Sequence, residues 1–110
     1  MTATVDPAQL TRAVDRLVTQ IGHWSPARWA GAAPTGDHSR ADVVHALVQR
    51  LADLEAEASG RPGRPVPRLD NDLALPDQLR VLAGDLVVAD LGPAVRAAAL
   101  DAVNATRQRL

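Results

Sequence analysis

Three histidines are the residues of this chain best suited to chemistry, because imidazole is a common ligand of zinc, iron and nickel. They are His23, His38 and His45. Two histidines one turn apart on a helix would indicate a metal site, but no two of these have that spacing. His38 and His45 are separated by Ser39, a predicted helix cap. We therefore expect ordinary hydrogen bonds from all three, and we expect no metal and no cofactor.

The acidic residues give no stronger pattern. Residues 70–72, with the sequence Asp-Asn-Asp, look like the start of a calcium loop, but no glycine follows at the sixth position and Val81 occupies the twelfth. Helix capping or a turn explains them better. Asp85 and Asp90 are five residues apart, so they do not share a helix face and do not form an acid–base pair. We predict no catalytic residue.

One segment is basic and rich in proline. Arg61, Arg64 and Arg68 alternate with prolines in the sequence GRPGRPVPRLDND, residues 60–72. A stiff strip of arginines can clamp a carboxylate or phosphate, or contact an acidic partner. The same strip can instead be a solvated crossover whose arginines pair with nearby aspartates or helix ends. Its prolines and glycines predict an extended path in either case.

The loop between residues 22 and 39 is long and holds both tryptophans. Ser25 and Pro26 are typical of the cap and first position of a short helical turn, which places Trp24 just before the cap and Trp29 at the fourth helical position. This is the arrangement of a hydrophobic staple, so we expect the two indoles to touch. If the loop instead forms a ligand pocket, Trp24, Trp29, His38 and His45 would line it.

Apolar residues recur with helical spacing in four stretches, which predict helices at about 7–21, 40–59, 77–90 and 93–109. Asp6 and Ser39 precede the first two as caps, and the Gly92-Pro93 pair separates the last two. A half-length piece would bury too little surface to fold alone, so residues 1–110 should share one core. We predict an all-α, single-domain four-helix bundle with a short extra helical turn in the first long loop.

The third predicted helix has more apolar surface than a bundle requires. Leu79, Leu82 and Leu86 form its main stripe, whereas Val81 and Val88 fall on the opposite face and Leu91 lies between the two. A helix that is apolar nearly all round is buried centrally or covered by another chain. Val81, Val88 and Leu91 therefore predict an interface, either with a second copy of this chain as a homodimer or with another protein.

Composition excludes several classes of protein. The chain has no cysteine, and all 12 of its basic residues are arginine, so disulfides, thiol nucleophiles and lysine Schiff bases are absent. Its net charge of −1 argues against nucleic-acid binding, and Arg96 is followed by three alanines where a reading helix needs polar side chains. With no signal-like start and no long apolar run, we expect a cytoplasmic protein with no membrane contact.

Residues 10–89 also resemble a known family in order and character. The helix SRADVVHALVQRLADL and the later helix LALPDQLRVLAGDLVVA are similar to the N-terminal four-helix bundle of mycothiol-dependent maleylpyruvate isomerases and the wider DinB-like group. In that family an early histidine of the second helix, matched by His45, joins two later histidines at a divalent metal. No histidine follows His45 in this chain. The resemblance implies a shortened, metal-free relative without the family's enzymatic activity.

Taken together, the sequence predicts a small helical protein that is not catalytic and acts through protein–protein contacts or self-association. The alternative is a DinB-like protein that binds a metal or a small molecule at the tryptophan and histidine loop. A third possibility is an anion binder that uses Arg64 of the proline-rich strip.

Overall fold

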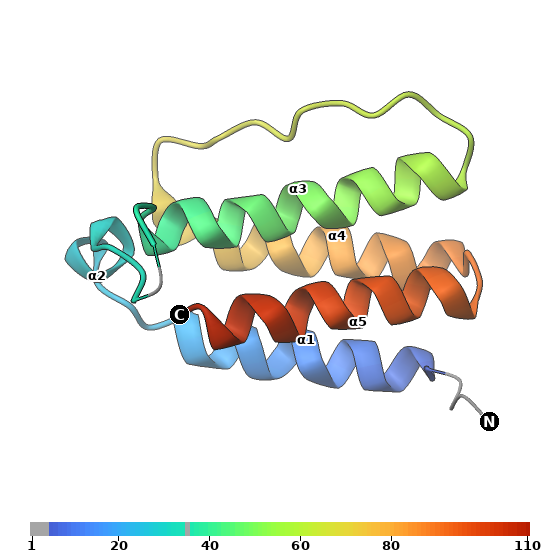
Figure 1. Cartoon of the computed structure of the whole chain (residues 1–110), viewed down its shortest axis with the longest axis horizontal. Coiled ribbons are helices and arrows are strands. Elements are labelled where there is room, and N and C mark those ends of the chain that lie inside the picture. The colour runs from blue at the N-terminus through green and yellow to red at the C-terminus, as the bar shows by residue number, and fades with distance from the viewer. Residues whose placement is uncertain (1–4, 35) are drawn as a thin grey trace.

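Helices account for most of the chain in the computed structural model, which describes residues 5–34 and 36–110 (Figure 1). They are α1 (Pro7–Ile21), α2 (Pro26–Ala30), α3 (Arg40–Ala58), the 3-10 helix η1 (Asp72–Ala74), α4 (Leu75–Ala89) and α5 (Pro93–Gln108). The described residues contain no strand, and an isolated bridge joins Ala32 to Ser39. The predicted all-α class is confirmed. None of the described helices is long and apolar enough to cross a membrane.

The predicted caps form as expected. Asp6 begins α1 with a capping box, accepting a hydrogen bond from the Ala8 N–H while Gln9 bonds back to the Asp6 N–H. Ser25 caps α2 and Ser39 caps α3 through their hydroxyl oxygens. Each of these side chains satisfies a backbone N–H that the helix leaves free, so the first three helices begin where the sequence predicts.

The start of α4 differs from the prediction by two residues. The predicted helix began at Asp77 behind Pro76, but α4 begins at Leu75 and contains Pro76 in its first turn. Asn71 caps the preceding turn η1 by accepting a hydrogen bond from the Leu73 N–H, and η1 runs directly into α4. Proline lacks only an N–H that the first turn leaves unpaired, so it fits inside the helix start.

The four long helices pack side by side around one aliphatic core. α4 and α5 each contact both α1 and α3. The core includes Leu10, Leu17, Ile21, Val44, Val48, Leu51, Leu79, Leu86 and Val103, and the indole of Trp29 closes one end. Alanines such as Ala83 and Ala99 are also buried, which lets neighbouring helices approach closely.

The direction of the helices explains the proline-rich segment. In Figure 1, α3 and α4 run in the same direction, opposite to α1 and α5. The chain must therefore return along the whole length of α3 before α4 begins. A helix of 19 residues is about 28 Å long, which about nine residues of extended, proline-rich chain can cover. We name residues 61–71, which make this return, the crossover strap.

We expect Leu79→Ala to lower the free energy of unfolding by about 2–5 kcal/mol, because Leu79 is fully buried in the core. Chemical denaturation followed by circular dichroism would measure the change. Leu73→Ala is the matched control, since Leu73 is 45% exposed and should cost less than about 1 kcal/mol. Equal losses in the two variants would show that the described core is wrong.

Candidate functional site

The two tryptophans are structural rather than solvent-facing. Trp24 and Trp29 lie edge to face with ring centroids 5.0 Å apart, as the staple arrangement predicts. Both are buried, and the guanidinium groups of Arg28 and Arg40 lie over the Trp24 ring at 5.0 and 6.0 Å. This cluster fastens α2 and the first loop to the start of α3.

The histidines are not brought together at a metal. His23 lies near the Thr19 carbonyl one turn back in α1, and His38 is exposed in the loop before α3. Nε2 of His45 lies 3.1 Å from the carbonyl oxygen of Val66, to which it donates because a carbonyl only accepts. Within residues 5–34 and 36–110, no three histidine or acidic side chains could hold a metal ion.

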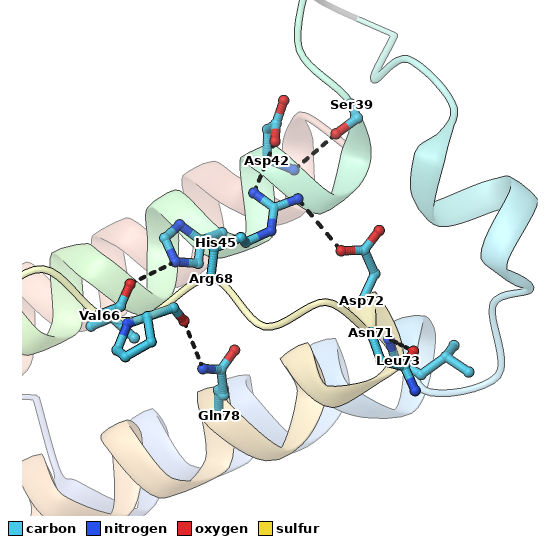
Figure 2. A network of polar contacts seen from close by, with 10 residues as sticks. Ser39, Asp42, His45, Val66, Arg68, Asn71, Asp72, Leu73 and Gln78 are labelled. Carbon is cyan, nitrogen blue, oxygen red and sulfur yellow. Dashed lines mark hydrogen bonds and ion pairs between the residues drawn. The ribbon is translucent and has the colours of Figure 1, made fainter.

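The predicted pocket of Trp24, Trp29, His38 and His45 is therefore not supported by these contacts. The two indoles are buried against each other, while His45 is turned toward the crossover strap (Figure 2). The sequence did not reveal the contact of His45 with the strap, because its partner Val66 lies 21 residues further along the chain.

Side chains of α3 and α4 bind the backbone of the crossover strap. The amide of Gln49 accepts from the Val66 N–H at 2.6 Å and donates to the Arg64 carbonyl at 3.0 Å. Gln78 of α4 donates to the Pro67 carbonyl. Together with His45, these groups satisfy the backbone of an extended segment that makes no regular secondary structure.

Two of the three predicted strap arginines form ion pairs within the chain. Arg68 donates to the carboxylates of Asp42 at 2.9 Å and Asp72 at 3.5 Å, so it joins α3 to the start of η1 (Figure 2). Arg61 pairs with Glu55 at 2.8 Å. Arg64 is exposed beside a groove lined also by Ala52, Ala56 and Pro62. The strip thus acts largely as a fastened crossover, one of the two interpretations that the sequence left open.

The predicted interface residues separate into two groups. Val81 and Val88 are 59% and 86% exposed, on the side of α4 opposite its buried stripe. Leu91 does not join them: it is half-buried and packs against the core. The reason is that α4 ends at Ala89 and Asp90 adopts a left-handed conformation with φ of 47°, which turns the following residues inward.

An apolar groove runs beside Val88, between α1 and α4. Its volume is about 320 Å³, and it is lined by Leu10, Thr11, Val14, Asp15, Arg80, Ala83, Gly84, Val87 and Val88. We name this groove together with Val81 the α4 face. The sequence predicted Val81 and Val88 as part of this face but not Gly84. A glycine in the middle of a predicted helix could have indicated that this position also belongs to it.

The fold and these contacts define an all-α protein in which the described histidine and acidic side chains form no group that could hold a metal ion. Comparison with known proteins gives no further assignment. No protein family, curated protein or solved structure matches the chain.

Arg68 lowers the pKa of Asp42. Its hydrogen bond, and to a lesser degree its charge, hold the pKa of the Asp42 carboxyl below the usual value of 3.8, although partial burial opposes this. Because this pKa is lower in the folded state, the ion pair stabilises the fold above about pH 4. That contribution disappears as the pH falls through the folded-state pKa.

We expect Arg68→Gln to raise the pKa of Asp42 toward 3.8, since the variant removes the charged donor. A carbon-detected NMR titration of the Asp42 carboxyl would measure this. Arg64→Gln removes the same charge from the same strap without touching Asp42 and should leave the pKa unchanged. A pKa that moves equally in both variants would show that general charge, not the contact, is responsible.

Proposed function

We propose that this protein is non-catalytic and acts by self-association, two copies of the chain meeting through their α4 faces. The proposal includes a four-helix bundle of the DinB-like kind as its scaffold and the cytoplasm as its location. The observation that carries the proposal is Gly84, which lies at the centre of an exposed apolar face. No contact within the chain requires a glycine at this position.

Glycine in the middle of a helix is costly. It destabilises a helix by about 0.5–1 kcal/mol relative to alanine. In many proteins such a glycine is needed because another element of the same chain packs against it. At Gly84, however, an added Cβ would find no atom within 4 Å. Close approach of a second backbone explains why a side chain is missing here.

The residues around Gly84 fit the same explanation. Val88 and Val81 lie on the same side of α4 and expose large apolar side chains, for which burial against another chain is favourable. The rim of the groove carries one positive residue, Arg80, and one negative residue, Asp15, and neither forms an ion pair within the described residues. A face with both charge signs is self-complementary, which favours a second copy over a partner of a single charge sign.

We expect Gly84→Ala to act with opposite signs on the chain and on its association. At dilute concentration, where the chain is monomeric, thermal stability should rise by about 0.5–1 kcal/mol. The dissociation constant of the dimer, measured by sedimentation equilibrium, should increase about tenfold or more, since the methyl group holds the two helices apart. A variant that is stabilised but associates as before would contradict the role given to Gly84.

We expect Val88→Asp to abolish association while leaving the helical content unchanged, because Val88 is 86% exposed in the single chain. Leu73→Asp is the matched control, an apolar-to-acidic change at an exposed site on η1, outside the α4 face. If the unmodified protein stays monomeric at millimolar concentration, self-association is wrong.

The alternative, a DinB-like metal or small-molecule site, has a separate test. Stoichiometric zinc, iron or nickel in protein purified without an affinity tag would favour that alternative over self-association. Loss of the metal in His45→Ala would then assign it to the family's histidine position.

A further inference from the structure

A second groove, between α1 and α5, has a different chemical character. It has a volume of about 250 Å³ and is lined by Gln9, Arg12, Ala13, Arg16, Leu100, Asn104 and Arg107. Three of these seven residues are arginines and none is acidic. The groove continues toward the ends of both helices along Gln20 and Gln108.

The three arginines of this groove are distinguished by lying together without an acidic neighbour in the lining, not by lacking ion pairs, since Arg64 and Arg80 also form none within the described residues. None of Arg12, Arg16 and Arg107 forms an ion pair within the described residues, whereas Arg61, Arg68 and Arg96 all do. Arg107 has an internal role, because a positive charge in the last turn of α5 favours the negative end of the helix. Arg12 and Arg16 have none that the structure shows.

The position of these charges is also unfavourable. Arg12 and Arg16 are four residues apart on α1, a spacing at which like charges repel and destabilise a helix. Arg107 adds a third positive charge from the neighbouring helix in the same groove. An arrangement that is unfavourable in the empty protein becomes favourable when an anion with several charges occupies it.

We propose that the α1–α5 groove binds a compact diphosphate group, either as free diphosphate or as the end of a nucleoside diphosphate. Guanidinium groups bind phosphoryl oxygens with paired, charge-assisted hydrogen bonds. Three of them along one groove match an anion with more than one phosphoryl group, and the Asn104 amide supplies a further donor. The lining contains no aromatic residue on which a base could stack. The groove therefore recognises the phosphates, and free diphosphate should bind as tightly as ADP.

The experiment is calorimetric titration of the full chain with inorganic pyrophosphate at low salt, with ADP and sulfate as parallel arms. We expect saturable binding of one pyrophosphate per chain, equal affinity for ADP, and an affinity for sulfate about tenfold or more weaker, since one dianion engages fewer guanidinium groups. ADP that binds while pyrophosphate does not would overturn the proposal, as would the absence of saturable binding in all arms.

Substitution of single arginines tests the position of the site. Arg16→Gln should weaken pyrophosphate binding about tenfold or more. Arg50→Gln makes the same charge change on the exposed side of α3 and should alter the affinity by less than about threefold, the effect of general charge. Equal losses in the two variants would show that pyrophosphate binds by net charge and not in this groove.

Thermal melting gives a readout independent of the calorimetry. Without ligand, Arg16→Gln should melt at a higher temperature than the unmodified protein, because repulsion from Arg12 and Arg107 is relieved. With pyrophosphate, the order should reverse, since only the unmodified protein gains stability from the ligand. A variant that melts lower in both conditions would show that Arg16 serves the fold and would overturn the proposal.

Discussion

The parallel packing of α3 and α4 is the constraint on which the rest of the structure depends. Consecutive helices that run in the same direction cannot be joined by a short turn, so the chain must travel back along α3 as an extended segment (Figure 1). Such a segment has no internal hydrogen bonds, and its backbone must find partners elsewhere. Gln49, His45 and Gln78 supply them, and Arg68 fixes its end through Asp42 and Asp72. Asp42, His45 and Gln49 of α3 thus have contacts that hold the crossover strap in place.

The sequence predicted the helices well because helix signals are local. Caps such as Asp6, Ser25 and Ser39 act within three residues, and the apolar period is visible in any window of two turns. It also predicted the contact of Trp24 with Trp29, since a staple spans only six consecutive residues. It did not predict the partner of His45 or the burial of Leu91. The partner of His45 lies 21 residues away in the sequence. The burial of Leu91 depends on the left-handed conformation of Asp90, which the pattern of side chains does not predict.

Two features carry a local cost that no ion pair or packing contact among residues 5–34 and 36–110 offsets. Gly84 lowers the stability of its helix although an added Cβ would meet no atom within 4 Å. Arg12 and Arg16 repel each other, and the residues that line their groove include no carboxylate that could neutralise them. In a chain where most local choices agree with the fold, such conflicts indicate surfaces shaped by something outside it. Exposure alone is weaker evidence, because the surface of any folded protein is largely apolar in area.

Both surfaces include α1, on opposite flanks of the same helix. Leu10, Val14 and Asp15 line the groove toward α4, while Arg12 and Arg16 line the groove toward α5. The buried stripe between them, which includes Leu17 and Val18, holds α1 against the core. The two proposed binding surfaces therefore use different residues of α1. Any effect of one surface on the other has to pass through a displacement of α1 itself, and the closely packed core resists such a displacement. The two surfaces are therefore expected to act independently.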